Sequence, residues 1–293
     1  MSAPRRQVLV TGARGQLGAA LWRAAPPECQ ITGLDHAQLD ITDRKAVHEA
    51  VARARPSLIL NAAAYTAVDL AEQERDKAFA VNAVGPGFLA EAAVVHGARL
   101  IHVSTDYVFD GEKDTPYAPG EATAPLSVYG ESKLAGERAV MQASRKRALV
   151  VRSAWVYANE GRNFLGTMRR LLREKSEVRV VNDQFGAPTH AASLARALWR
   201  WADLPLARGV RHWTDAGTTN WFGFASAIRN ALASAEPDAR LATLVPIPTS
   251  EYPTAARRPA RAVLDCSASY LEIGEAATWD AELRLCLAAG AAR

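Results

Sequence analysis

The sequence predicts an α/β fold, a doubly wound parallel sheet with a smaller C-terminal α/β lobe. Through the first half of the chain, short and almost uninterrupted apolar runs alternate with stretches of helical periodicity. Such runs are typical of parallel strands that helices cover on both faces. A glycine-rich turn directly after the first run favours the same fold class. Strands are expected over residues 8–10, 31–34, 58–60, 100–103 and 149–151.

The expected helices fill the intervals between these strands, and the rhythm changes after Arg152. The C-terminal part is rich in proline but keeps Leu, Val, Tyr and Trp throughout, which favours a folded lobe over a linker. We therefore predict one domain of residues 1–154 with roughly 184–217, and a smaller lobe of 155–183 and 218–293. Helices are expected over 44–55, 76–96, 132–143, 163–175 and 194–202, and one further strand over 178–181.

Composition excludes several classes of protein. The 293 residues are 49% hydrophobic and 23% charged, as in ordinary soluble domains. The net charge of +4 is scattered without a basic run, so we expect no nucleic-acid binding. Residues 1–6 lead into too short an apolar run for a signal peptide, and no uninterrupted apolar run is long enough for a spanning helix. The sequence thus predicts a cytoplasmic protein without membrane contact. The widely spaced Cys29, Cys266 and Cys286 lack metal-ligand spacing.

A glycine-rich turn, Gly12, Gly15 and Gly18, follows the first expected strand and opens a helix. Glycines there permit a tight turn, close approach of the backbone to a pyrophosphate, and close packing of helix on strand. The N-terminus of the helix offers free N–H groups to phosphate oxygens. The turn therefore predicts a dinucleotide site of the Rossmann type, to which Arg14, Gln16 and Leu17 are also expected to contribute.

Two residues give opposite indications about the dinucleotide. Asp35 ends the second expected strand, where a carboxylate can accept hydrogen bonds from the adenosine ribose and favours NADH. Arg14 could instead pair with a 2′-phosphate and favours NADPH. We expect either cofactor to be accepted. Asp40 and Ile41 are expected near the adenine, although the neighbouring Thr42 or Asp43 could cap the next helix.

Tyr129 and Lys133 are four residues apart at the start of an expected helix, so both side chains share one face. A tyrosine can protonate the oxygen of a carbonyl that accepts a hydride, and a nearby ammonium is expected to bring its pKa close to 7. Thr105 ends the fourth expected strand, at the edge of the sheet where ligands bind, and could orient the carbonyl. Together these residues predict hydride transfer from a nicotinamide to a carbonyl group.

The same residues lie in longer motifs that resemble the extended short-chain dehydrogenase/reductase superfamily and, within it, the dTDP-4-dehydrorhamnose reductase family. The resemblance implies a Rossmann domain, a substrate-binding lobe, and reduction of the C4 keto group of dTDP-4-dehydro-6-deoxy-L-mannose to dTDP-L-rhamnose by NADPH or NADH. The most specific motifs are STDYVFDG (104–111), NDQFGAPT (182–189) and PTSEYPTAARRP (248–259), beside GARGQLG, NAAAYTAVD, SVYGESKLAGE and RSAWVYA.

The resemblance also implies roles for individual positions. It makes Thr105, Tyr129 and Lys133 the catalytic set, with Tyr129 and Lys133 also contacting the cofactor. Further expected cofactor contacts are Ala62, Ala63, Ala64 and Ser104. Beside Thr105, the expected substrate contacts are Thr66, Asp106, Tyr107, Trp155, Asn163, Gln184 and Arg258.

The sequence departs from the family at a few positions. Some relatives form a dimer linked by magnesium through glutamates, and the matching positions here are Ala20 and Ala192. Because alanine cannot ligate a hard cation, we expect no metal and, if the protein is a homodimer, one without this link. Ala255 and Ala262 replace the proline and serine that relatives often carry in the last motif.

Two other functions remain open. The first is a non-catalytic, NADP-binding regulatory subunit, against which the intact Thr105, Tyr129 and Lys133 count. The second is another nucleotide-sugar reductase or epimerase of the superfamily. A 4,6-dehydratase is disfavoured because Tyr107, rather than a second acid, follows Asp106.

Overall fold

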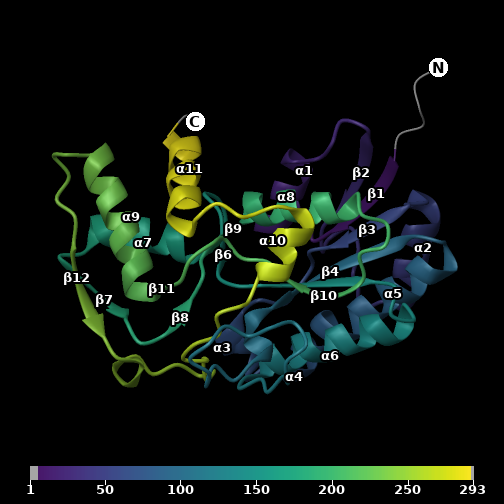
Figure 1. Cartoon of the computed structure of the whole chain (residues 1–293), viewed down its shortest axis with the longest axis horizontal. Coiled ribbons are helices and arrows are strands. Elements are labelled where there is room, and N and C mark those ends of the chain that lie inside the picture. Colours follow the sequence, from purple (N-terminus) through teal and green to yellow (C-terminus); the bar gives the residue numbers. More distant parts are fainter. Residues whose placement is uncertain (1–5, 292–293) are drawn as a thin grey trace.

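A six-stranded parallel sheet lies at the centre of the large lobe in the computed structural model, which describes residues 6–291 (Figure 1). Successive side chains of each strand point to opposite faces, and helices cover both faces. This is why the apolar runs in the sequence are nearly continuous, and the expected fold class is confirmed. The strands are β1 (Arg6–Thr11), β2 (Cys29–Leu34), β3 (Leu58–Asn61), β4 (Arg99–Thr105), β5 (Leu149–Ser153) and β10 (Gly209–His212).

The order of the strands places a binding crevice at the carboxyl end of the sheet. The order is β10-β5-β4-β3-β1-β2, so the chain turns to one side after β1 and to the other side from β3 onward. Ligands of doubly wound sheets bind where the order reverses, at the carboxyl ends of the strands. Here this point lies between β1 and β3, with the end of β4 next to it.

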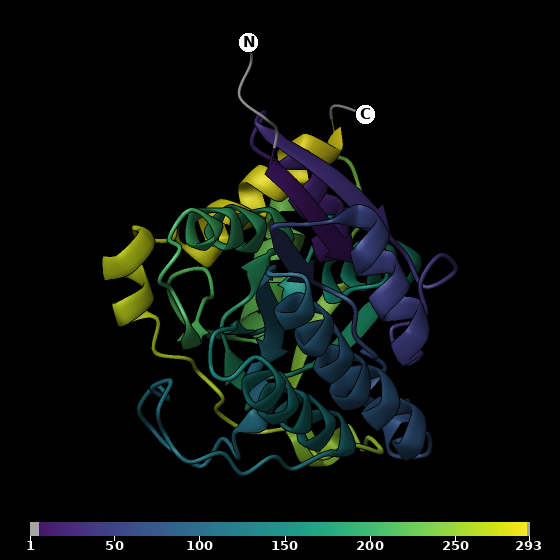
Figure 2. The same cartoon turned by 90° about the vertical axis from the view of Figure 1, so that its right-hand side faces the viewer.

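Two helical layers enclose the sheet (Figures 1 and 2). Val8 and Val10 belong to the core on one face, and Leu9 and Ile59 to the core on the other. The first layer holds α1 (Gln16–Arg23), α8 (Ala191–Ala202) and the short α10 (Ser267–Ile273), which packs against α8 and β10. The second layer holds α2 (Arg44–Ala54), α5 (Gly85–Val95) and α6 (Val128–Ala143).

The single helix expected over 76–96 is instead three consecutive segments, preceded by the short α3 (Val68–Ala71). They are α4 (Arg75–Phe79), a π-helical turn (Ala80–Val84) and α5. By length and composition alone this stretch could cross a membrane, but half of its most apolar window is buried inside the fold. Residues such as Leu89 and Ala93 belong to the core between the sheet and this layer.

The smaller lobe has its own core and stands beside the sheet (Figure 1). In it α7 (Phe164–Glu174), α9 (Trp221–Ala235) and α11 (Trp279–Ala291) pack with the parallel strands β7 (Glu177–Val181) and β12 (Thr243–Ile247). Two-stranded pairs connect it to the rest: β6 (Val156–Tyr157) with β9 (Thr189–His190), and β8 (Phe185–Gly186) with β11 (Thr219–Asn220).

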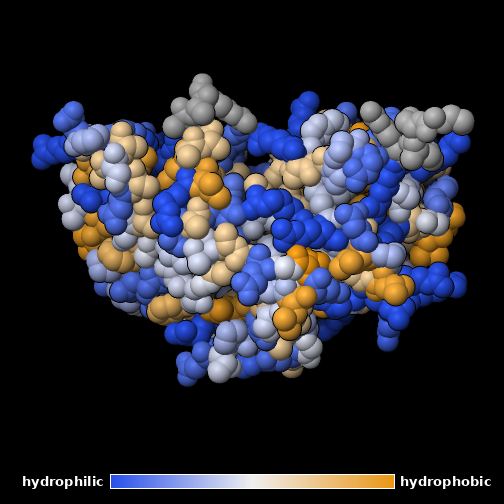
Figure 3. Space-filling view, turned by 45° about the horizontal axis from the view of Figure 1, so that its top comes forward, coloured by the Kyte–Doolittle hydropathy of each residue, from blue (hydrophilic) through white to orange (hydrophobic). Residues whose placement is uncertain are grey.

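The surface shown in Figure 3 carries hydrophobic residues in small groups among hydrophilic ones. The expectation about a signal peptide rests on residues 1–6, of which 1–5 lie outside the described part of the chain.

Candidate active site

A cavity of about 620 Å³ opens at the carboxyl end of β4 and brings the expected catalytic residues together. Thr105 is the last residue of β4, and Tyr129 and Lys133 lie in the first two turns of α6. The side chain of Ser127 begins this helix by accepting a hydrogen bond from the N–H of Gly130 at 3.2 Å. Thr105, Tyr129 and Lys133 all line the cavity.

The protonation of Tyr129 differs from the expectation. Burial raises the pKa of its hydroxyl to about 12, and a hydrogen bond with Thr105 opposes this only in part. The Lys133 ammonium, 2% exposed, donates to the carbonyl oxygen of Val103 at 2.7 Å. The expectation that Lys133 brings the pKa of Tyr129 close to 7 is therefore wrong for this structure, because desolvation dominates and the group that lowers the pKa of Tyr129 is Thr105. Tyr129 is a neutral phenol at neutral pH.

Asp106 is a buried carboxyl group in the wall of the same cavity. The hydroxyl of Thr105 donates to its Oδ1 at 2.9 Å, while its Oδ2 is buried and has no hydrogen-bond partner among the described residues. Burial raises the pKa of Asp106 to about 7.

Behind the cavity lies a charged network that sequence reasoning missed. Glu137, one turn after Lys133 on α6, accepts hydrogen bonds from the hydroxyl of Ser104 at 2.6 Å and from the guanidinium of Arg152 at 2.8 and 2.7 Å. The side chains of Ser104, Lys133, Glu137 and Arg152 are all buried. The helical spacing of Lys133 and Glu137 was the available signal, but Arg152 lies far from both in the sequence.

The glycine-rich turn fits the dinucleotide that it predicts. Gly12 has a φ of +70°, and a Cβ atom there would lie 2.7 Å from the N of Ala63. At Gly18 a Cβ atom would lie 2.2 Å from the carbonyl oxygen of Gly12. Only glycine permits this approach of α1 to the turn, which leaves the N-terminus of α1 open to the cavity. Gly15, Gln16 and Leu17 line the cavity at this end, beside the expected Ala62 and Ala64.

A second cavity, of about 610 Å³, continues from the glycine-rich turn toward the end of β2. It shares Arg14 and Gly15 with the first cavity. The Nε of Arg14 lies 2.8 Å from Oδ2 of Asp35, so the two residues with opposite indications form an ion pair, in which Arg14 is largely exposed. Apolar Leu39 offers a surface for an adenine. Asp40 and Ile41 line this cavity as expected.

The expected substrate residues divide into two groups. The first group lines the first cavity and consists of Thr66, Asp106, Tyr107, Trp155 and Asn163. Ser104, an expected cofactor contact, lines the same cavity. Gln184 and Arg258 are not among the residues that line either cavity. Both oxygens of Asp69 accept hydrogen bonds from the Arg258 guanidinium, at 3.0 and 2.6 Å. Gln184 is bonded to Thr249 and to the indole N–H of Trp221.

Two further aromatic residues complete the wall opposite the sheet. Trp155 and Trp221 stack with ring centroids 3.5 Å apart, and Phe164 packs on Trp221 at 4.7 Å. All three line the cavity. Sequence reasoning missed Trp221 and Phe164, because a helical pattern does not distinguish an aromatic residue in a cavity wall from one in a core.

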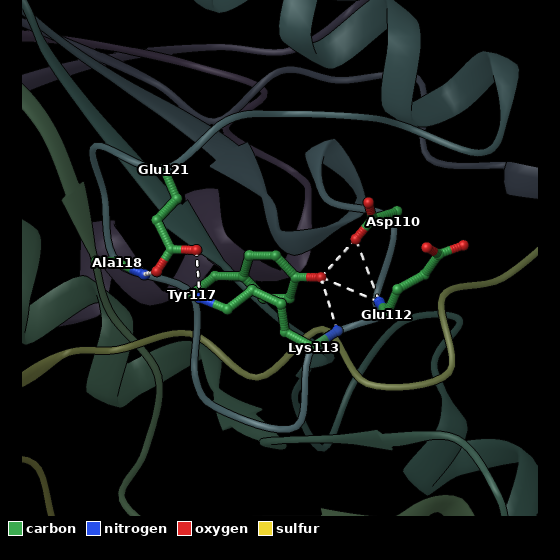
Figure 4. Close-up of polar contacts among 6 residues, drawn as sticks. All are labelled: Asp110, Glu112, Lys113, Tyr117, Ala118 and Glu121. Atoms are coloured by element: carbon green, nitrogen blue, oxygen red, sulfur yellow. Dashed lines mark hydrogen bonds and ion pairs between the residues drawn. The ribbon is translucent and has the colours of Figure 1, made fainter.

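The loop between β4 and α6 has an internal polar frame (Figure 4). It follows the short 3₁₀ helix Asp106–Val108. The Tyr117 hydroxyl donates to Asp110 at 2.5 Å and accepts from two backbone N–H groups. Glu121 accepts hydrogen bonds from a backbone N–H and from the ammonium of Lys113. This frame holds the loop that leads from the end of β4, where Thr105 lies, to the start of α6.

The residues at the magnesium positions of some relatives do not fit a cation. Ala20 and Ala192 line a third cavity, of about 420 Å³, which three arginines (Arg23, Arg169 and Arg196) line together with Glu160 and His190. Alanine has no oxygen ligand, and a guanidinium repels a cation. Within residues 6–291, no group of three His, Cys, Asp or Glu could hold a metal ion. The absence of a metal nevertheless stays a prediction.

Comparisons with known proteins point in one direction. A family model described as RmlD substrate binding domain matches residues 6–291. A dTDP-4-dehydrorhamnose reductase of Burkholderia thailandensis is 42% identical over 292 residues, covering 96% of this chain and 98% of that protein. That of Escherichia coli K12 is 43% identical over 260 residues, covering 86% and 87%. The solved structure of a dTDP-4-dehydrorhamnose reductase from Bacillus anthracis, in complex with NADP, superposes with a TM-score of 0.91 at 36% identity, covering 97% and 99%.

The family model spans almost the whole described chain, and both relatives exceed 40% identity over most of their own length. The resemblance inferred from the motifs is thereby confirmed. The chain belongs to the RmlD substrate binding domain family, the family of the dTDP-4-dehydrorhamnose reductases.

Proposed function

We propose that this protein reduces the C4 keto group of dTDP-4-dehydro-6-deoxy-L-mannose to give dTDP-L-rhamnose, with NADPH or NADH as the reductant. The observation that carries the proposal is the meeting of Thr105, Tyr129 and Lys133 in one cavity with the glycine-rich turn. This arrangement supports a hydride donor and a proton donor on the same carbonyl group.

A reduced nicotinamide, when bound, supplies the hydride to the carbonyl carbon. The neutral phenol of Tyr129 gives its proton to the carbonyl oxygen, so that a hydroxyl group forms and the tyrosine becomes a phenolate. The raised pKa of Tyr129 suits this direction of the reaction, because the donor is fully protonated beforehand. Thr105 orients the carbonyl oxygen, and the Lys133 ammonium stabilises the phenolate that results.

The described residues support a nucleotide sugar in the remaining space. Thr66, Tyr107 and Asn163 supply polar groups to the cavity wall. Asp106 holds the hydroxyl of Thr105 in this wall through its Oδ1. Trp155 offers an apolar wall that Trp221 supports by stacking. Gln184 and Arg258 are held beside this wall by Thr249 and Asp69, and their contact with the substrate stays a prediction.

The two-lobe division, the cytoplasmic location and, if the protein is a homodimer, an assembly without a magnesium link are part of the proposal. Residues 1–154 with 184–217 bind the cofactor, and 155–183 with 218–293 bind the sugar. α10 lies within the second range but packs against α8 and β10 of the large lobe. The scattered basic residues offer no surface for nucleic acid.

A coupled assay that follows NADPH and NADH oxidation with the keto sugar tests the proposal. We expect turnover by the wild type and, for Tyr129→Phe, a kcat lower by roughly 10²- to 10⁴-fold, because the proton donor is lost. Binding of NADPH, measured by titration of its fluorescence, should stay the same. Tyr252→Phe, at an exposed tyrosine, is the matched control and should keep full activity.

Near-wild-type turnover by Tyr129→Phe would overturn the proposed mechanism. Absence of cofactor oxidation by the wild type, together with tight binding of a partner enzyme, would favour the regulatory subunit instead.

A further inference from the structure

Glu137 occupies an unusual position behind the active site. It is 4% exposed, and its two carboxylate oxygens accept hydrogen bonds from Ser104 and Arg152 at 2.6 to 2.8 Å. It does not line the cavity, whereas Ser104 does. A buried ion pair of this kind adds little net stability compared with apolar packing, so its presence next to a site calls for a reason beyond stability.

The network reaches the cavity in two ways. Ser104 precedes Thr105 on β4, so the bond to Glu137 fixes the strand end that carries the carbonyl-orienting hydroxyl. Lys133 lies one turn before Glu137 on the same face of α6. Its ammonium is buried and donates to the carbonyl oxygen of Val103, and no carboxylate of residues 6–291 accepts a hydrogen bond from it.

The charge of Lys133 therefore depends on its surroundings. Burial lowers its pKa to about 8, and the negative charge of Glu137 opposes this shift. Burial also keeps the neighbouring His102 neutral, since its pKa is well below the usual value. Tyr129 is neutral as well.

Two further groups near Lys133 can carry a charge, the guanidinium of Arg152 and the carboxyl group of Asp106. Arg152 binds Glu137 directly, donates to the carbonyl oxygen of Pro119, and contacts His212. Burial lowers the pKa of His212 to about 3, so that imidazole is neutral. Asp106, whose pKa burial raises to about 7, lies across the cavity wall. Glu137 is thus the carboxylate on the same helix face as Lys133.

We propose that Glu137 is a positioning residue of the reductase site, which anchors Ser104 at the end of β4 and places a carboxylate on the same face of α6 as Lys133. The inference rests on the proposed function. It assigns Glu137 no contact with the substrate or the cofactor.

The direct test measures the ionisation of Lys133 in the protein alone. The sequence has six lysines, so NMR spectra of protein with ¹³C-labelled lysine Cε are simple, and a Lys133→Gln variant assigns the resonance. Glu137→Gln should lower the midpoint of the Lys133 titration by about one pH unit or more, because a nearby opposite charge is lost. Glu137→Asp, which keeps the carboxylate, should show a Lys133 midpoint close to that of the wild type. Glu131→Gln, an exposed position on the same helix, should leave it unchanged.

Activity provides the second readout. The alkaline limb of kcat/KM against pH should move to lower pH in Glu137→Gln by the same amount as the NMR midpoint. If Glu137 is only structural, the profile of the variant will superimpose on that of the wild type after scaling, and the NMR midpoint will not move. That pair of results overturns the inference but leaves the reductase function intact. A wild type without any activity overturns the function, while the NMR midpoint still decides the inference about Lys133.

Glu137→Gln leaves Arg152 as an unpaired buried charge and could prevent folding. The double variant Glu137→Gln/Arg152→Gln removes both charges and keeps two amides that can bond to each other. Compared with Arg152→Gln alone, the double variant should show a Lys133 midpoint lower by about one pH unit, because the two variants differ only in the charge of residue 137. Equal midpoints in these two variants overturn the inference.

Discussion

At the scale of single residues, burial decides which groups carry charge in this site. Tyr129, Asp106 and Lys133 all line one cavity, and burial shifts the pKa of each toward the neutral form. For the phenol this preserves the proton that the reduction consumes. For the carboxyl group the same effect costs stability, because at neutral pH a partly ionised acid lies in a desolvated site.

Asp106→Asn should therefore stabilise the protein in a pH-dependent way. The folded-state pKa of Asp106, about 7, lies above its ordinary value of 3.8, so ionisation opposes folding increasingly from about pH 4 to 7 and then levels off. Relative to the wild type, the variant should gain about 2 to 3 kcal/mol more at pH 8 than at pH 5. Urea unfolding at both pH values measures this. Asp114→Asn, at an exposed loop position, should show no such difference, and an equal gain at both pH values for Asp106→Asn would contradict the argument.

Arg14 should decide how strongly a 2′-phosphate is favoured. Its guanidinium is 86% exposed and forms an ion pair with Asp35 at the edge of the second cavity, where the adenosine is expected. Arg14→Gln should weaken NADPH binding by about 3- to 10-fold and leave NADH binding nearly unchanged, since an exposed ionic contact contributes about 1 kcal/mol. Fluorescence titration with both cofactors measures this. Equal losses for NADPH and NADH would show that Arg14 contacts a part common to both.

The sequence predicted individual residues well where a motif ties them to an element. Thr105, Tyr129 and the glycines follow from strand ends and helix starts, and the structure brings them together. Arg258 shows the limit, because its guanidinium is bonded to Asp69, a residue remote in the sequence. A contact of that kind depends on how two loops meet, and no local pattern encodes it.

At the scale of elements, the close approach of α6 to the π-helical turn positions the first turns of α6. Asn82, in that turn, donates to the hydroxyl of Ser132 at 3.0 Å, and Ser132 in turn donates to the carbonyl oxygen of Tyr129 at 2.8 Å. At Gly136, a Cβ atom would lie 2.0 Å from the carbonyl oxygen of Asn82. The absence of a side chain at this glycine is what lets the two helices touch.

Gly136→Ala should consequently destabilise the protein although alanine is the better helix former. Separating the two helices should cost about 1 to 3 kcal/mol, as overpacking generally does. Gly87→Ala in α5 is the matched control, since its Cβ would make an ordinary contact at 3.4 Å with Ala139. The control should be neutral or gain up to about 1 kcal/mol. Thermal or urea unfolding measures both variants, and equal effects would refute the role assigned to the contact.

The sequence predicted the elements that have a continuous apolar run or a clear helical periodicity. The five apolar runs became β1 to β5. β1, β3, β4 and β5 are interior strands, which need apolar residues at nearly every position, whereas β2 is an edge strand of partly buried residues that keeps a short apolar run. β10 was missed, since it is an edge strand of four mostly half-buried residues. The π-helical turn was missed because it leaves the apolar character of the stretch around it unchanged.

At the scale of the whole molecule, contacts between the two lobes close the cavity over the glycine-rich turn. Asn163 begins α7 and donates to the side-chain oxygen of Gln16 at 2.8 Å. The cavity thus has walls from both lobes, with Trp155 and Phe164 facing the strand ends. A nucleotide sugar bound there must contact both lobes at once.

Magnesium should have no effect on assembly of this protein. Ala20 and Ala192 offer no ligand, and Arg23 and Arg196 line the same cavity. Sedimentation velocity in excess EDTA and in millimolar Mg²⁺ should give the same distribution of species, whatever that distribution is, and the melting temperature should not change. A shift to a larger species upon addition of Mg²⁺ would contradict this.

The stacked pair of Trp155 and Trp221 gives the cavity an optical reporter of its own. Indole emission overlaps the absorption band of reduced nicotinamide, so a ring in the cavity wall can transfer excitation to a bound cofactor. Quenching of the protein's ultraviolet emission then signals cofactor occupancy without any label, and Trp155→Phe separates the contribution of this pair from that of the other tryptophans. Stopped-flow records of that signal could follow cofactor arrival and departure within a single catalytic cycle.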